Sequence, residues 1–139
     1  YEIGSGLVGS EMCIRDSERA SAGWQTVEEA LNVADVLHQH ASTPVLLDCL
    51  TLWLTNLLLD EREVEGPTTA LLASLHARTA PTVMVGNEVG LGIVPQSPLG
   101  RRFRDEAGLL HQRLAACVGK VVFVAAGLPM VLKNEGASA

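Results

Sequence analysis

Apolar residues in this chain fall into short continuous runs that alternate with longer stretches in which apolar positions recur at helical spacing. The short runs are rich in valine and leucine, as expected for strands buried in a parallel sheet. The expected strands are 45–48, 82–86 and 121–125. The expected helices are 26–41, 49–59, 68–78 and 99–118. This alternation predicts an α/β fold, a mostly parallel sheet with helices on both faces.

Local signals set several of the expected boundaries. Thr26 precedes two acidic residues, which indicates the N-cap of the first helix. The acidic segment 60–67 reads as an exposed loop, and Thr68 or Thr69 is expected to cap the helix that follows it. Residues 130–132 are apolar and are interpreted as one more strand at a sheet edge.

The first seventeen residues give no such pattern. Gly4 to Gly9 formally match G-x-G-x-x-G, but only three residues precede the motif and no helical pattern follows it, so a dinucleotide site is rejected. Residues 7–17, LVGSEMCIRDS, resemble a translated adapter of transposon-based sequencing libraries. We therefore expect 1–17 to be a non-native adapter-derived segment without packed structure, and 18–139 to be the C-terminal part of a single nucleotide-binding α/β domain.

Composition narrows the class of protein. The 139 residues suffice for one domain, and 47% are apolar, enough for a sizeable core. A formal net charge of −6 disfavours nucleic acid or an anionic membrane as the main partner. The three cysteines lack zinc or disulfide spacing, and we see neither a signal peptide nor a bilayer-length apolar run. These features predict a cytoplasmic protein.

Ligands of parallel α/β sheets bind beyond the carboxyl ends of the strands, where two expected loops carry unusual residues. Asp48 ends its strand after three apolar residues, a position that suits a carboxylate holding the Mg²⁺ of a nucleoside triphosphate. Capping of the next helix is the other interpretation of Asp48, and both can hold together. The second loop, 87–95, begins with Asn87 and Glu88 and contains two glycines that let its backbone approach a ligand. Packing against a neighbouring subunit is the alternative role for this loop.

The helix expected at 99–118 has two sets of residues at helical spacing, each of which lies along one side of the helix. Its core stripe consists of Leu99, Phe103, Ala107, Leu110 and Leu114. The second stripe places Arg101, Arg104 and Asp105 just after the glycine-rich loop, and arginine is well suited to binding phosphate. A solvated i,i+4 ion pair is the simpler interpretation of Arg101 and Asp105. Gly108, which is unfavourable inside a helix, predicts a close backbone approach.

Three segments together resemble one family. They are LLDCLTLWLTNLL (46–58), NEVGLGIVP (87–95) and RRFRDEAGLLHQRLA (101–115). In this order they are similar to the adenosylcobinamide kinase/adenosylcobinamide-phosphate guanylyltransferase family of cobalamin biosynthesis, and the similarity extends over residues 18–139.

The resemblance implies a RecA-like P-loop fold, commonly a homotrimer, that uses ATP, GTP and Mg²⁺. It implies phosphorylation of adenosylcobinamide, followed by transfer of GMP from GTP onto adenosylcobinamide phosphate through a guanylylated histidine. Glu28 and Asp48 correspond to the nucleotide-binding acids of the family. Asn87, Glu88, Arg101, Arg104 and Asp105 are candidates for contacts with substrate or phosphate.

The chain departs from the family pattern at its N-terminal end. The family's G-G-x-R-S-G-K-S loop is absent, and the histidine would fall at about position 16, which is Asp16 here. We therefore expect an enzyme that lacks its N-terminal P-loop unit, and a chain that is inactive as it stands. Two alternatives are another P-loop small-molecule kinase or RecA-like ATPase, and a non-catalytic interaction domain.

Overall fold

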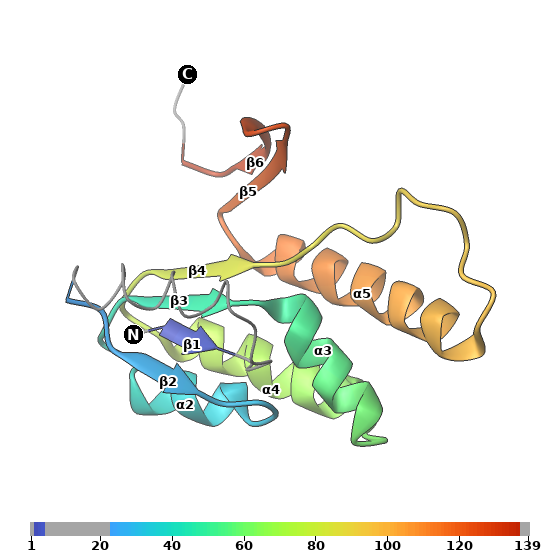
Figure 1. Cartoon of the computed structure of the whole chain (residues 1–139). Helices are drawn as coiled ribbons and strands as arrows, with labels where there is room; N and C mark the ends of the chain where they lie inside the picture. Colours follow the sequence, from blue (N-terminus) through green and yellow to red (C-terminus); the bar gives the residue numbers. More distant parts are fainter. Residues whose placement is uncertain (1, 5–22, 137–139) are drawn as a thin grey trace.

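A computed structural model of the chain describes residues 2–4 and 23–136. Its main sheet has four parallel strands in the order β2-β1-β3-β4 (Figure 1). A separate two-stranded sheet pairs β5 with β6 in antiparallel orientation. The strands are β1 (Glu2–Gly4), β2 (Thr26–Glu28), β3 (Val45–Asp48), β4 (Thr82–Val85), β5 (Lys120–Ala125) and β6 (Leu128–Asn134).

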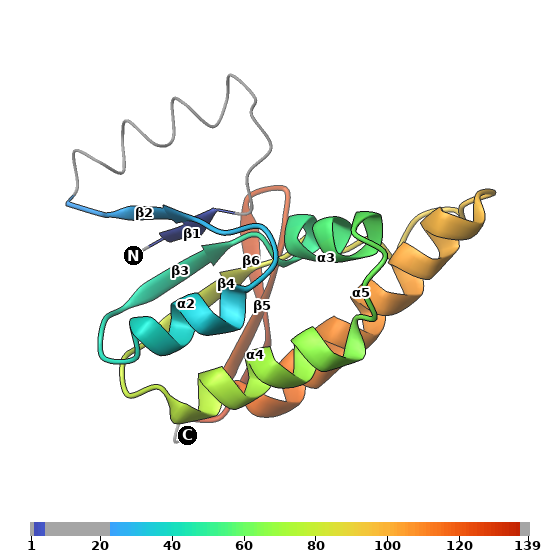
Figure 2. The ribbon, with the colours of Figure 1, turned by 90° about the horizontal axis from the view of Figure 1, so that it is seen from below.

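The described helices gather mainly on one side of the main sheet. Figure 2 shows α2, α4 and α5 on the same side of the strands, with α3 beyond their carboxyl ends. The helices are α2 (Val33–Gln39), α3 (Leu50–Leu59), α4 (Glu65–Ala77) and α5 (Pro98–Cys117). The α/β class, strands β3 and β4, and helices α3 and α5 are thereby confirmed to within about two residues. The expected cover of helices on both faces is not found among residues 2–4 and 23–136.

One face of the sheet packs against these helices. In β3, Val45 and Leu47 are buried, whereas Leu46 and Asp48 alternate with them and point to the other face. The buried side chains join a core contributed by α2, α3, α4 and α5. Its buried members are Val33, Val36, Leu37, Val45, Leu47, Leu50, Trp53, Leu57, Leu71, Leu110 and Leu114.

Strand β1 corrects the expectation that no part of residues 1–17 packs into the domain. Glu2–Gly4 lies between β2 and β3 and pairs with both in parallel register. A three-residue central strand is stabilised by backbone hydrogen bonds to both neighbours, which the composition of the segment does not reveal. Met12 and Ile14, two larger apolar residues of the same segment, lie outside the described residues.

The helix predicted to start at Thr26 begins seven residues later. Residues Thr26–Glu28 form strand β2 instead, and α2 starts at Val33. The acidic residues taken as a first helical turn have another role, because the carboxylate of Glu29 accepts hydrogen bonds from the N–H groups of Leu31 and Asn32, at 2.8 Å each. The prediction failed because capping and turn formation use the same residue types.

Helix α4 starts three residues before its predicted cap. Its first turn contains Glu65, Gly66 and Pro67, which had been assigned to a loop. Proline fits there because N–H groups of a first turn have no partner within the helix. Thr68 is therefore inside the helix, where its buried hydroxyl has no hydrogen-bond partner among the residues that the structure describes.

The predicted third strand of the parallel sheet, 121–125, belongs to a hairpin instead. β5 turns at Ala126 and Gly127, both with positive φ (52° and 76°), and returns as β6. Positive φ at both central residues is typical of a two-residue hairpin turn, which usually contains Asn-Gly. Ala126 stands where asparagine is usual, so the turn was not predicted from the sequence. Strand β6 (Leu128–Asn134) is also longer than the edge strand predicted at 130–132.

Arg78, which the sequence did not single out, ties α2 to the start of β4. Its guanidinium donates to the backbone carbonyls of Leu37, His40 and Thr43 at 2.6–2.9 Å and to the Thr82 hydroxyl at 2.7 Å. Three of these bonds supply partners to carbonyls at the end of α2 and the loop after it. Arg78 is therefore a structural residue.

Replacing Arg78 with alanine should lower the free energy of unfolding by about 2–3 kcal/mol, because these carbonyls lose a charged donor. Urea unfolding followed by circular dichroism measures this change. Arg62→Ala is the control, since the guanidinium of Arg62 forms an exposed ion pair with Asp60 and its loss should change stability by less than about 1 kcal/mol. Equal effects of the two substitutions would contradict the structural role of Arg78.

Candidate functional site

Strand register brings Glu28 and Asp48 to the same edge and the same face of the sheet. Both residues pair with Gly4 of β1, Glu28 from one side and Asp48 from the other. Side chains at paired positions of a parallel sheet point to the same face, and two strand spacings separate these backbones by roughly 10 Å. That face is opposite to α2 and α4, because Val27 and Leu47, the preceding residues, belong to the core side.

Helix α3 fixes the loop that follows Glu28. The indole N–H of Trp53 donates to the carbonyl of Leu31 at 2.9 Å, and the amide of Asn56 donates to the carbonyl of Ala30 at 3.2 Å. Trp53 is 1% exposed, so its hydrogen bond lies at the boundary of the core. The same helix that follows Asp48 therefore holds the segment after Glu28, and the two acids are positioned together.

The negative charge of the Glu29 carboxylate stabilises the loop between β2 and α2. The backbone N–H groups of Asn32 and Leu31 hold the pKa of the Glu29 carboxyl below its ordinary value of 4.5. A carboxylate with a lowered folded-state pKa stabilises the fold above its unfolded-state pKa. That contribution is lost as the pH falls through the folded-state pKa.

Glu29→Gln should therefore reduce stability at pH 7 and make little difference near pH 3. Glutamine retains an oxygen that accepts hydrogen bonds, so the comparison isolates the charge of residue 29. Chemical unfolding of both proteins at pH 7, 5 and 3 measures the gap between them. A gap of constant size down to pH 3 would show that the charge of Glu29 does not stabilise the loop.

The strand end next to Asp48 is closely packed. Gly86 follows β4, and a β-carbon added there would lie 2.8 Å from Nε2 of His111 and 3.6 Å from Leu50. The next residue, Asn87, donates its backbone N–H to the buried hydroxyl of Thr51 at 3.0 Å. A side chain at residue 86 would therefore have to displace the His111 imidazole, which packs where α5 passes the end of β4.

The glycine-rich loop is held by its own carboxylate and by arginines of α5. The carboxylate of Glu88 accepts a hydrogen bond from the N–H of Gly90, and Arg104 donates to the carbonyl of Gly90 at 2.7 Å. Arg101 donates to the carbonyls of Pro95 and Gln96, at 3.2 and 2.5 Å. The helix itself begins with Ser97 as N-cap, whose hydroxyl accepts from Gly100 N–H at 3.1 Å.

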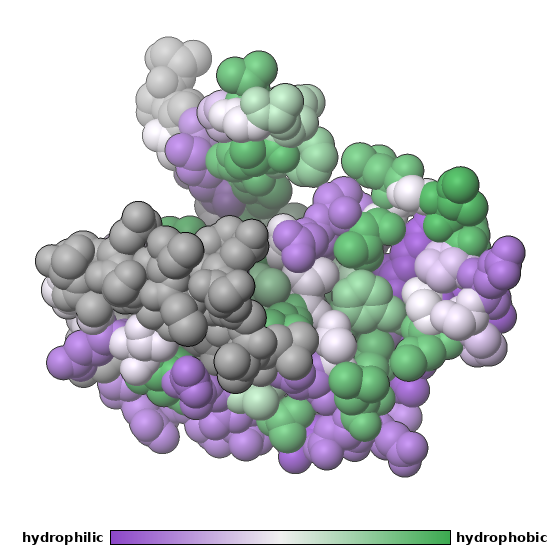
Figure 3. Space-filling view, in the orientation of Figure 1, coloured by the Kyte–Doolittle hydropathy of each residue, from purple (hydrophilic) through white to green (hydrophobic). Residues whose placement is uncertain are grey.

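The middle of this loop exposes apolar side chains. Val89 attaches the loop to the protein interior, because it packs against a second core cluster between α3 and α5. Beyond it, Leu91, Ile93 and Val94 are 82%, 98% and 59% exposed. Figure 3 shows hydrophobic surface both on this loop and on the β5–β6 hairpin.

Several expectations for α5 need correction. Ala107, Leu110 and Leu114 are buried as predicted, but Leu99 is 52% exposed because it lies in the first turn, at the end of the packed region. A β-carbon at Gly108 would meet nothing within 4 Å, so the predicted close approach is absent from the described structure. Arg102 points toward Glu63 and Glu106, at 3.9 and 4.0 Å, and Asp105 is exposed.

The carboxylates at the strand ends are too few to hold a metal ion alone, but they suit an ion whose other ligands come from a bound nucleotide and water. The described residues contain no group of three or more His, Cys, Asp or Glu side chains arranged to hold a metal. Mg²⁺ at nucleotide sites uses one or two carboxylates together with phosphate and water oxygens, which the position of Asp48 fits. No helix in the described ranges meets the length and apolarity needed to cross a membrane.

Comparison with known proteins identifies the family. Its model, described as cobinamide kinase / cobinamide phosphate guanyltransferase, matches residues 13–132. A Pseudomonas aeruginosa protein named bifunctional adenosylcobalamin biosynthesis protein CobP is 44% identical over 138 residues, which cover 96% of this chain and 79% of that protein.

Two enterobacterial relatives agree, both named bifunctional adenosylcobalamin biosynthesis protein CobU. The Escherichia coli protein is 35% identical over 127 residues, covering 79% of this chain and 70% of its own length. The Salmonella typhimurium protein is 33% identical over 156 residues, covering 96% and 84%. On these matches, the chain belongs to the cobinamide kinase / cobinamide phosphate guanyltransferase family.

Proposed function

We propose that the protein phosphorylates adenosylcobinamide with ATP or GTP and then transfers GMP from GTP to adenosylcobinamide phosphate, giving adenosyl-GDP-cobinamide. Family membership and the names of its relatives support both activities. The structural observation that best supports the proposal is the strand register. Glu28 and Asp48 both pair with Gly4 of β1, which puts two carboxylates on one face of the sheet, at the carboxyl ends of the strands.

Asp48 and Glu28 form the nucleotide side of the proposed site. Mg²⁺, when bound with the nucleotide, neutralises phosphate charge that develops during transfer, and Asp48 is the residue proposed to hold it. Glu28 lies two strands away, a distance that suits contact with another part of the same nucleotide. The Trp53 and Asn56 hydrogen bonds support this role, because they restrict the segment that carries Glu28.

The glycine-rich loop and the start of α5 form the proposed corrinoid side. Asn87 and Glu88 open the loop beside Asp48, and Arg104 uses one N–H group to hold the loop at Gly90. Guanidinium groups have five N–H donors, so Arg101 and Arg104 retain donors for the phosphate of adenosylcobinamide phosphate. Asp105, exposed on the next turn, is a candidate for a polar contact with the corrinoid.

The phosphate-binding loop and the guanylylated histidine are proposed to lie in an N-terminal portion of the protein that this chain does not contain. Residues 18–139 are then the C-terminal part of one RecA-like P-loop domain, and the adapter-like segment 1–17 contributes strand β1 (Glu2–Gly4) to its sheet. The proposal includes a cytoplasmic homotrimer, as the family resemblance implies. Two catalytic elements come from that portion: a lysine for the β- and γ-phosphates and a nucleophile for GMP.

The proposal is tested in a completed protein, in which the Pseudomonas aeruginosa sequence that precedes its counterpart of Glu18 replaces residues 1–17 of this chain. Arg104→Ala should raise the KM for adenosylcobinamide phosphate about tenfold, because losing a charged hydrogen bond to the phosphate weakens binding by roughly 1.4 kcal/mol. Self-guanylylation with GTP alone should stay unchanged, since that step needs no corrinoid. The two steps are assayed separately.

Arg102→Ala is the matched control, because Arg102 is on the same turn of α5 but points toward Glu63 and Glu106. It should leave both steps unaltered. An unchanged KM in Arg104→Ala would show that the arginines only hold the loop. Absence of both activities from the completed protein would refute the proposed function itself.

A further inference from the structure

The loops after β3 and β4 are joined by one buried hydroxyl. Thr51, in the first turn of α3, is 7% exposed. Its Oγ1 accepts a hydrogen bond from the backbone N–H of Asn87 at 3.0 Å and donates to the sulfur of Cys49 at 3.4 Å. A hydroxyl group has one proton and two lone pairs, so it can make both contacts at once. Thr51 therefore links the residue that follows Asp48 to the residue that follows Gly86.

This hydrogen bond lies at the start of the glycine-rich loop. Asn87 is exposed, whereas its backbone N–H is directed toward the buried hydroxyl of Thr51. Three residues later the loop is held again, by the hydrogen bond from Arg104 to the carbonyl of Gly90. The Thr51 hydrogen bond therefore determines where the loop begins relative to the end of β3, and with it the position of Asn87 relative to Asp48.

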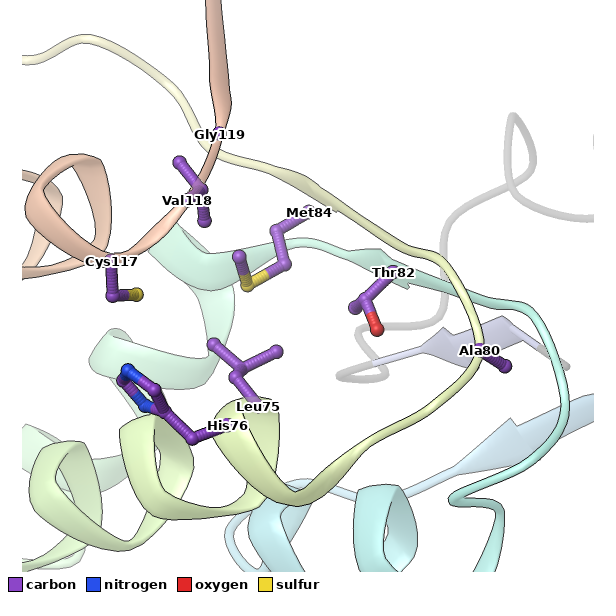
Figure 4. A pocket seen from close by; sticks show the side chains of 8 residues that line it. All are labelled: Leu75, His76, Ala80, Thr82, Met84, Cys117, Val118 and Gly119. Carbon is purple, nitrogen blue, oxygen red and sulfur yellow. The ribbon is translucent and has the colours of Figure 1, made fainter. Parts of the chain in front are cut away.

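Apolar contacts hold β4 at a different place. Figure 4 shows the side chain of Met84 turned toward a cavity of about 230 Å³, which Leu75 and Cys117 also line. Met84 packs against the main core, so its contacts stabilise the strand. A substitution at residue 84 changes this packing without removing the hydrogen bond to Asn87. The stability of β4 and the position of the loop can therefore be separated by experiment.

We propose that Thr51 is a positioning residue for the corrinoid step. Its hydroxyl holds the glycine-rich loop (87–95) at the distance from Asp48 that transfer of GMP to adenosylcobinamide phosphate requires. Because Thr51 is buried, it acts through the backbone of Asn87. The inference rests on the proposed function, since it takes residues 87–95 as the corrinoid side of the site. Asp48 itself is held by the pairing of β3 with β1 and β4, so the nucleotide side does not depend on this hydroxyl.

Thr51→Val in the completed protein tests this role. Valine has the shape of threonine but cannot accept the hydrogen bond, so the N–H of Asn87 loses its buried acceptor. We expect kcat/KM for GMP transfer to adenosylcobinamide phosphate to fall about tenfold. Self-guanylylation with GTP alone should change by less than about twofold. Thr51→Ser, which restores a hydroxyl, should recover most of the lost kcat/KM.

Two control substitutions separate positioning from stability. Thr55→Val removes a hydroxyl one turn later on α3, where it donates to the backbone carbonyl of Thr51 at 2.9 Å. Met84→Ala enlarges the cavity beneath β4 and should lower the urea midpoint at least as much as Thr51→Val does. Both controls should leave kcat/KM within about twofold. An equal fall of kcat/KM in Met84→Ala and Thr51→Val would show that the stability of β4, and not the hydroxyl, determines the rate.

Hydrogen exchange of the Asn87 amide provides a reading that needs no enzyme assay. In the unsubstituted 139-residue chain, this amide should exchange at least about tenfold more slowly, relative to its intrinsic rate, than the amide of Leu91 in the exposed middle of the loop. Thr51→Ser should keep this protection, and Thr51→Val should remove it. Equal protection of the two amides in the unsubstituted chain would overturn the proposal, even if a variant failed to fold.

The outcomes distinguish this inference from the proposed function. An active completed protein in which folded Thr51→Val keeps the normal kcat/KM would reject the role of Thr51 alone. Absence of both activities from the unsubstituted completed protein would reject the proposed function, and with it the catalytic consequence of the Thr51 contact.

Discussion

The 139-residue chain should show neither kinase nor guanylyltransferase activity, whereas the completed protein should show both. The sequence contains no G-K-S loop, so it lacks the backbone N–H cradle and the lysine that bind the β- and γ-phosphates. It also has no histidine at the position expected for the nucleophile, where Asp16 stands. Loss of a nucleophile removes the covalent step altogether, so the expected difference is at least 10⁴-fold.

Radiolabelled GTP measures this difference directly. The completed protein should retain label after denaturation, as a guanylylated protein does, and the 139-residue chain should not. Replacing the fused histidine by alanine provides the matched control, since it should abolish labelling while phosphorylation of adenosylcobinamide persists. Stable labelling of the 139-residue chain would mean that one of its own residues is the nucleophile.

In the completed protein, Asp48→Asn should reduce both half-reactions at least a hundredfold, about 2.7 kcal/mol of transition-state stabilisation. Both reactions start from a nucleoside triphosphate, and Asp48 ends β3 on the open face of the strand ends. Asparagine keeps the shape of the side chain but loses the charge that is proposed to hold Mg²⁺ while phosphate charge redistributes.

The control for this substitution is Asp35→Asn. Asp35 is an exposed acid in the first turn of α2, on the side of the sheet opposite to the Asp48 side chain, and its loss should leave both rates within about twofold. The alternative role of Asp48, capping α3, predicts a different outcome. The N-cap residue of α3 is Cys49. If Asp48→Asn guanylylates itself normally but unfolds at lower urea concentration, stabilisation of α3 is the better account.

Local pattern and observed structure disagree in segments 26–32 and 121–125. The segment 26–32 has a helix-like spacing of apolar and acidic residues, yet its backbone is fixed by hydrogen bonds from the distant residues Trp53 and Asn56 of α3, which leave no periodicity in the segment. The segment 121–125 has the pattern of a buried parallel strand, but it pairs with the neighbouring strand β6 through a turn at Ala126 and Gly127.

The sequence by itself determined the family and those helices and strands whose boundaries depend on residues within or next to them. β3 and β4 are continuous apolar runs, and α5 has its own N-cap at Ser97, a proline in its first turn and a core stripe ending at Leu114. The same residues carry the family resemblance, because ligand-binding loops follow these strands. Asp48, Asn87 and Glu88 were therefore identified as candidates without a structure.

The tertiary structure decided which of these residues lie together. Register places Glu28 opposite Gly4 and Gly4 opposite Asp48, so two acids twenty residues apart in the sequence share one face. The approach of His111 to Gly86 and the bond from Arg104 to Gly90 are equally non-local. Such contacts depend on how strands align and helices pack, and the pattern of a single segment constrains neither.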